Sequence, residues 1–182
     1  MNNLANLAEI QDYRLYNPGA QLLLDTNVLL IFLVGIYDED YLKECPLMTD
    51  NNKNYGKEHF DLVQEILKCF IYKIVITPQV LAEIYMLSSK KIKPPSRFNE
   101  YFVGLINQLK KCREEHIPLK ILLEGNGSVV RFGFTDISLV EAAKKLKSAI
   151  LTDDFPLYEA FREVVPVIYF SQVCVAGIFD RR

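Results

Sequence analysis

The stretch that decides the fold reads Gln21-Leu22-Leu23-Leu24-Asp25-Thr26-Asn27-Val28-Leu29-Leu30. A short apolar run ends at an acid, two polar residues follow, and a second apolar run begins. We expect a buried strand before Asp25 and a helix over residues 27–35 after it. Asp25 would then lie at the carboxyl end of a strand, where open α/β sheets bind their ligands. Asp is also a preferred residue for capping a helix, so capping is an equal alternative for this residue taken alone.

The composition is that of a globular chain. It has 182 residues, half of them hydrophobic, and a net charge of -2. We expect a single domain over residues 1–182 with a sizeable core. Because the chain carries no excess of positive charge, an anionic partner must be held by a local basic patch or by bound metal ions. Four scattered cysteines and two histidines argue against a disulfide framework and against a zinc finger.

No targeting or membrane signal is visible in the sequence. The first ten residues lack the basic and apolar regions of a signal peptide, and the longest apolar run, residues 28–37, is too short to span a bilayer. We therefore expect a cytoplasmic protein that does not enter a membrane.

Strand patterns alternate with helix patterns along the chain. Further strands are predicted at residues 71–76, 149–152 and 164–169, and helices at residues 58–70, 78–88, 97–115, 136–147 and 156–162. This alternation predicts a parallel sheet of about four to five strands covered by helices on both faces. Residues 1–20 are interpreted as an N-terminal arm, and residues 38–57 and 90–130 as insertions.

Glu83 is the second acid of interest. In the predicted helix it lies three residues after Val80 and four before Leu87, which puts its carboxylate beside the inward apolar face. A charge there is costly unless it is paired or binds a metal ion. The alternative is a glutamate at the edge of the apolar stripe that turns outward to solvent.

Three more acids lie at comparable places. Asp136 follows Thr135 at a predicted helix start, where the helix dipole alone would stabilise a carboxylate. Asp153 and Asp154 follow the strand predicted at residues 149–152. Adjacent carboxylates repel each other unless a cation lies near them, although a solvated turn is the more common explanation of such a pair.

Taken together, the acids predict a metal site. Several carboxylates that converge on one pocket would be destabilised without a divalent cation. Oxygen ligands and the scarcity of histidine favour Mg²⁺ or Mn²⁺ over zinc. Hydrolysis of a phosphodiester bond is the chemistry that such a site suits.

At this point the chain resembles the PIN-domain ribonucleases. The resemblance rests on four segments in chain order: Leu22-Leu23-Leu24-Asp25-Thr26-Asn27, Ile76-Thr77-Pro78-Gln79-Val80-Leu81-Ala82-Glu83, Phe134-Thr135-Asp136-Ile137 and Ile150-Leu151-Thr152-Asp153-Asp154-Phe155. It covers most of the chain apart from the arm and the two insertions. It implies a three-layer α/β/α sandwich around the parallel sheet, with one or two Mg²⁺ or Mn²⁺ ions and cleavage of RNA.

The resemblance also implies roles for individual residues. The catalytic metal ligands would be four acids, with Asp153 as a further ligand: Asp25, Glu83, Asp136 and Asp154. The polar residues that orient carboxylates or water would be Thr26, Asn27 and Thr152. Toxins of bacterial toxin–antitoxin pairs are similar in these motifs, but the gaps before Glu83 and Asp136 are longer here. Such relatives imply a homodimer and an inhibitory protein partner.

Basic residues suggest where RNA could bind. Four of them cluster just after the helix that carries Glu83: Lys90, Lys91, Lys93 and Arg97. Two more runs comprise Lys110, Lys111 and Arg113, and Lys144, Lys145 and Lys147. Such runs could hold phosphates, but they are more often solvated helix faces.

Three functions stay open from the sequence. The leading prediction is a metal-dependent endoribonuclease. The second is a catalytically silent PIN-like module that binds RNA or a protein partner. The third is a phosphotransferase or phosphatase with Asp25 as nucleophile, which ranks last because position 27 is Asn and not the second Asp that haloacid-dehalogenase-like enzymes place there.

Overall fold

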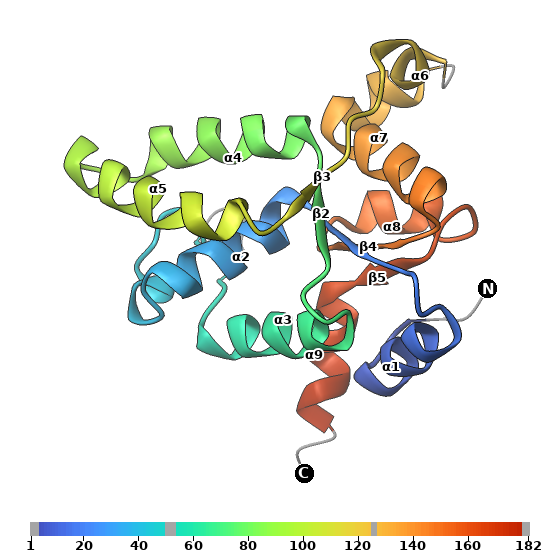
Figure 1. Ribbon diagram of the computed structural model, residues 1–182. Coiled ribbons are helices and arrows are strands. Elements are labelled where there is room, and N and C mark those ends of the chain that lie inside the picture. Colours follow the sequence, from blue (N-terminus) through green and yellow to red (C-terminus); the bar gives the residue numbers. More distant parts are fainter. Residues whose placement is uncertain (1–3, 50–53, 125–126, 180–182) are drawn as a thin grey trace.

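The computed structural model describes residues 4–49, 54–124 and 127–179. Within these ranges the chain builds one five-stranded, all-parallel sheet with the strand order β3-β2-β1-β4-β5 (Figure 1). The strands are β1 (Leu22–Leu24), β2 (Ile74–Ile76), β3 (Arg113–Glu114), β4 (Ala149–Thr152) and β5 (Val167–Tyr169). The predicted α/β class with a parallel sheet is therefore confirmed.

Helices fill the segments between the strands. The described helices are α1 (Leu7–Tyr16), α2 (Thr26–Tyr37), the short 3₁₀ helix η1 (Asp40–Lys43), α3 (Lys57–Cys69), α4 (Pro78–Lys91), α5 (Pro95–Leu109), α6 (Leu119–Leu123), α7 (Ser128–Leu146), α8 (Phe155–Phe161) and α9 (Phe170–Phe179). Figure 1 shows α7 and α8 on one side of the strands and α1, α3 and α9 on the other. The sheet is covered on both faces, as the alternating pattern predicted.

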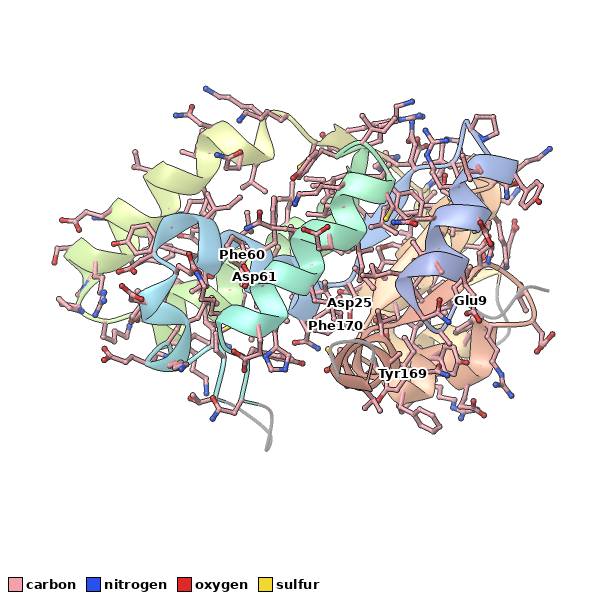
Figure 2. All side chains as sticks on the ribbon, turned by 90° about the horizontal axis from the view of Figure 1, so that it is seen from below. Glu9, Asp25, Phe60, Asp61, Tyr169 and Phe170 are labelled. Carbon is pink, nitrogen blue, oxygen red and sulfur yellow. The ribbon has the colours of Figure 1, made fainter. Side chains whose placement is uncertain are left out.

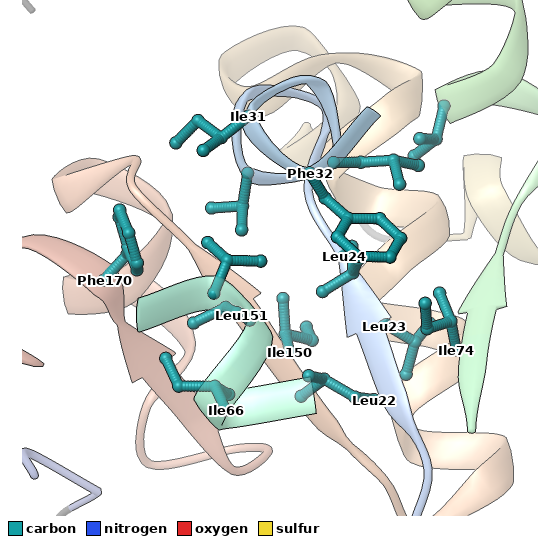
Figure 3. Close-up of a cluster of buried hydrophobic side chains, with 14 of the residues drawn as sticks. Leu22, Leu23, Leu24, Ile31, Phe32, Ile66, Ile74, Ile150, Leu151 and Phe170 are labelled. Carbon is teal, nitrogen blue, oxygen red and sulfur yellow. The ribbon is translucent and has the colours of Figure 1, made fainter. Parts of the chain in front are cut away.

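The central strand explains why the opening stretch organises the chain. Leu22, Leu23 and Leu24 are all 0% exposed, since β1 is flanked by strands on both edges and by helices on both faces. A continuous apolar run is what a strand buried on both faces requires. Figure 3 shows these leucines together with Ile150 and Leu151 of β4 below α2.

The register of β1 and β4 sets the position of the first acid. Leu24 pairs with Leu151, and the N–H of Asp25 donates to the carbonyl of Leu151 at 3.0 Å. Asp25, directly after β1, and Thr152, the last residue of β4, therefore lie at the carboxyl ends of neighbouring strands. The chain runs from β1 to β2 on one side and later returns to β4 on the other side, so the strand order reverses here.

The strand predicted at residues 71–76 is shorter in the structure. Ile71 and Tyr72 have positive φ values of 54° and 53°, and β2 begins only at Ile74. The N–H of Tyr72 donates to the carbonyl of Leu67 at 2.9 Å, which closes a turn at the end of α3. The β-rich composition of this pair was misleading because the chain has to reverse direction there.

The predicted insertion at residues 90–130 is mostly regular structure. The helix predicted at residues 97–115 is wrong at its end, because α5 stops at Leu109 and Arg113–Glu114 forms the edge strand β3. The part of this insertion after residue 118 contains α6 and the start of α7. In the other insertion, residues 40–43 form η1, whereas residues 50–53 lie outside the described residues.

Both ends of the described chain pack as helices. In the predicted arm, α1 buries Ile10 and Tyr13 and packs against α3, and Figures 1 and 2 show it on the same face of the sheet as α3 and α9. Helix α9 was not predicted, because it follows β5 without an intervening turn. All four cysteines are free thiols, as expected. In the part of the chain that the structure describes, every helix is too short or too polar to cross a bilayer.

Candidate active site

A polar pocket of about 250 Å³ lies at the carboxyl ends of β1 and β4. Its described lining consists of Asp25, Thr26, Asn27, Glu83, Phe132, Gly133, Thr135, Asp136 and Asp154. Four of the five predicted acidic ligands are therefore brought together from four separate segments. The place is the point where the strand order reverses, which is the usual ligand site of open parallel sheets.

Asp25 is held between β1 and α2. It occupies the N-cap position of α2, but its side chain makes no capping hydrogen bond, so the capping alternative does not account for it. Its Oδ2 accepts a hydrogen bond from the Thr152 hydroxyl at 2.9 Å. Burial of this side chain, which is 5% exposed, raises its pKa to about 6, and the nearby charges of Asp154 and Glu83 also raise it.

Glu83 reaches the pocket from the second turn of α4. Its Oε2 accepts a hydrogen bond from the buried Thr26 hydroxyl at 2.8 Å. This bond connects α4 with the first residue of α2, next to Asp25. The alternative of a glutamate turned outward to solvent does not describe this side chain, because it lines the pocket.

Asp136 enters the site after a break in α7. Gly133 has φ 82° and ψ 174°, which separates Ser128–Phe132 from the longer second part of the helix. Thr135 lies two residues after this break, near the predicted helix start, and its carbonyl accepts a hydrogen bond from the Ser138 hydroxyl at 2.7 Å. Burial raises the pKa of Asp136 to about 7, and the charges of Asp25, Asp154 and Glu83 add to this rise.

Thr152 connects the acids of β1 and β4. Its hydroxyl donates to Asp25 and accepts a hydrogen bond from the N–H of Asp154 at 2.9 Å. The Oδ1 of Asp154 in turn accepts a hydrogen bond from the N–H of Leu157 at 2.8 Å, so this carboxylate caps α8 and also lines the pocket. A single hydroxyl therefore fixes the relative positions of two pocket acids.

Asp153, which was expected to be a further ligand, is not part of the described pocket lining. It is 2% exposed and accepts hydrogen bonds from the hydroxyl of Tyr55 at 2.5 Å, from the N–H of Ser171 at 3.1 Å and from the Ser171 hydroxyl. Successive side chains at a strand end point to opposite sides, which explains why Asp153 and Asp154 diverge. Asp153 ties the end of β4 to residue 55 and to α9.

The basic cluster expected to bind RNA does not line the pocket either. Lys91 lies eight residues beyond Glu83 on α4, a distance of about 12 Å along a helix axis. Lys93 donates to the carbonyl of Ser89 at 3.1 Å, and the Arg97 guanidinium lies 3.8 Å from the ring centre of Tyr41. Lys90 is exposed at the end of α4. These side chains belong to the junction of α4 and α5.

Phe132 and Gly133 line the pocket, and the sequence prediction missed them. Both fall between the predicted insertion at residues 90–130 and the helix predicted from residue 136. The available signal was a glycine between two phenylalanines directly before Thr135 and Asp136. A glycine so close to the start of an apolar helical pattern marks a position that needs a special backbone conformation.

No family model matches the chain, and no curated protein matches it. In the described residues, no group of three or more His, Cys, Asp or Glu side chains meets the requirements for holding a metal ion. The chemistry of the pocket therefore has to be inferred from its side chains. Acids whose pKa is raised by burial and by neighbouring like charges, as at Asp25 and Asp136, can be stabilised by protons or by a cation.

Proposed function

We propose that the protein is a cytoplasmic, PIN-like endoribonuclease that hydrolyses RNA phosphodiester bonds with the help of divalent metal ions. The observation that carries the proposal is the convergence of Asp25, Glu83, Asp136 and Asp154 on one pocket at the reversal of strand order. No ion pair within the described part of the site balances these charges. The four carboxylates repel one another in this pocket. Such an unfavourable grouping of like charges is typical of a functional site.

The donor set fits Mg²⁺ or Mn²⁺. All four acids offer oxygen atoms, and burial together with like charge raises the pKa of Asp25 and of Asp136. Among the described residues no three acids form a ready-made ligand group. This is compatible with Mg²⁺, which usually keeps several waters and contacts only one or two carboxylates.

In this proposal the pocket acids would hold the metal ions and the two buried threonines would keep the acids in place. Metal ions bound there would supply activation of water and stabilisation of the leaving oxygen. Thr152 fixes Asp25 relative to Asp154, and Thr26 fixes Glu83. By restricting the carboxylates, these hydrogen bonds reduce the rearrangement needed when an ion binds.

Cleavage of RNA by the purified chain tests the proposal. We expect cleavage of a mixed pool of unstructured and structured RNA with Mn²⁺ or Mg²⁺, and none with EDTA. Asp136→Asn should reduce the activity to background. Asp12→Asn is the matched control, since Asp12 is an exposed acid of α1. Absence of cleavage by folded protein that binds Mn²⁺, or full activity of Asp136→Asn, would contradict the proposal.

A catalytically silent PIN-like module is the second candidate. It is favoured by the absence of a ready-made three-acid group in the described ranges. Such a module would bind RNA or a protein partner without cleaving RNA and without needing Mn²⁺. The homodimer and the inhibitory partner stay predictions, and sedimentation of the purified chain tests the first of them.

A further inference from the structure

A short segment beside the pocket is bounded by two glycines in the left-handed region. Gly127 has φ 90° and Gly133 has φ 82°, and Ser128–Phe132 lies between them as the first turns of α7. Such φ values strain residues that carry a Cβ atom, whereas glycine adopts them readily. The break at Gly133 thus separates this segment from the part of α7 that carries Asp136.

Phe132 projects from this segment into the wall of the pocket. It is half-buried and lines the same space as the four acids. Its ring meets Phe161 of α8 edge to face, with ring centres 5.1 Å apart and an angle of 62°. This contact holds the ring in place beside the acids.

Arg131 supplies a cation at the same point. Its guanidinium carbon lies 4.8 Å from the ring centre of Phe132, and its side chain is exposed. The described lining of the pocket contains four acids and neither Lys nor Arg. A polyanion that approaches these acids needs a positive group nearby. Arg131 can supply it, because its guanidinium contacts Phe132, which lines the pocket.

An aromatic ring and a guanidinium side by side suit one kind of ligand. A flat base stacks on either surface, and the guanidinium also binds phosphate oxygens. Bases inside a duplex are already stacked on their neighbours and cannot use the ring. Arg131 and Phe132 therefore favour a single strand, whose bases are unpaired.

We propose, resting on the nuclease function above, that Arg131 and Phe132 form the nucleotide-binding element of the pocket. Phe132 stacks the base of an unpaired nucleotide next to the phosphate held at the acids, and Arg131 contacts a phosphate of the same strand. The ligand class is a single strand, with ribose or deoxyribose. Selection for unpaired nucleotides thus comes from this segment and not from the basic cluster at the end of α4.

The test compares two phenylalanines that flank Gly133. Phe132 lines the pocket, whereas Phe134 is 47% exposed and is not part of the described lining. Binding is measured by fluorescence anisotropy with a labelled twelve-nucleotide RNA, the DNA of the same sequence, and the RNA duplex. All variants carry Asp25→Asn so that the RNA is not cleaved.

We expect Phe132→Leu to weaken binding of both single strands at least about fivefold, which is the lower end for loss of one stacked base. Phe134→Leu should stay within about twofold, because a side chain outside the pocket offers no stacking surface. Binding of the duplex should be the same in both variants. Equal losses in Phe132→Leu and Phe134→Leu, or a loss confined to the duplex, would overturn the proposal.

Arg131→Gln gives an independent measurement on an exposed residue, so it does not depend on how Phe132 variants fold. Loss of one phosphate contact should reduce the slope of log K against log salt concentration by about 0.7 for a single strand. An unchanged slope would overturn the role of Arg131. If wild-type protein cleaves RNA while Phe132→Leu and Arg131→Gln behave as wild type, this inference fails and the nuclease function stands. If wild type neither binds Mn²⁺ nor cleaves RNA, the nuclease function itself fails.

Discussion

The hydroxyl of Thr77 lies 2.7 Å from the hydroxyl of Ser138, and both side chains are fully buried. Thr77 precedes α4, which carries Glu83, and Ser138 lies one turn beyond Thr135 on α7, which carries Asp136. Because Ser138 donates to the carbonyl of Thr135, Thr77 is the donor in the pair. This buried bond sets the relative positions of two helices that each bring an acid to the pocket.

We therefore predict that Ser138→Ala destabilises the protein and weakens metal binding together. The substitution leaves the buried hydroxyl of Thr77 without its acceptor, which costs about 1–3 kcal/mol. Urea unfolding and Mn²⁺ titration would measure the two effects. Ser89→Ala is the control, because the Ser89 hydroxyl bonds only to its own helix, at the carbonyl of Met86. An Ser138→Ala protein that binds Mn²⁺ as wild type does would show that the bond has no influence on the site.

The pH dependence of the metal-free protein gives a second prediction. The pKa values of Asp25 and Asp136 are raised from 3.8 to about 6 and about 7. Between pH 4 and pH 7 the folded state then binds more protons than the unfolded state, so stability falls as pH rises through this interval. We expect urea unfolding in EDTA to show lower stability at pH 8 than at pH 5.

Asp136→Asn should make this profile flatter and should stabilise the metal-free protein at pH 8 by at least about 1 kcal/mol, after allowance for solvent screening. Removal of a functional charge often stabilises a fold in this way. Asp12→Asn should leave the profile unchanged, since Asp12 is exposed on α1. Parallel profiles for wild type and Asp136→Asn would contradict the raised pKa that burial and the neighbouring acids give Asp136.

The hydroxyl of Thr152 gives a third prediction. It contacts Asp25 and Asp154 at once, so Thr152→Val should weaken Mn²⁺ binding about 10- to 100-fold, as loss of a residue that orients ligands usually does. Thr152→Ser retains the hydroxyl and should restore most of the affinity. If valine and serine behave alike, the hydroxyl has no orienting role and packing alone explains any loss.

The sequence was most informative where local chemistry and tertiary environment agree. The apolar run before Asp25 is a central strand because both of its faces are buried, and the Thr77-Pro78 signal places the start of α4 at Pro78. Thr77 holds the N-cap position of α4, but its hydroxyl makes no capping bond and bonds to Ser138. The side chain of Thr77 thus serves the packing of two helices.

The features that were missed depend on distant contacts or on backbone conformation. β3 consists of two exposed charged residues, Arg113 and Glu114, that pair with β2 through the backbone, so no apolar pattern marks it. Asp153 and Asp154 are chemically identical, and only their directions at the end of β4 separate a buried structural acid from a pocket acid. The break in α7, beside which Phe132 reaches the pocket, is marked in the sequence by one residue, Gly133.

The most direct test of the central claim is a calorimetric titration of Mn²⁺ into wild type, Asp25→Asn and Asp12→Asn at neutral pH, with thermal unfolding followed in parallel. A ligand that binds only the folded state must raise its stability. The account predicts saturable binding and a higher unfolding temperature for wild type and Asp12→Asn, and neither for Asp25→Asn. Folded wild type that binds no Mn²⁺, or Asp25→Asn that binds it equally well, would contradict a metal site built by these acids.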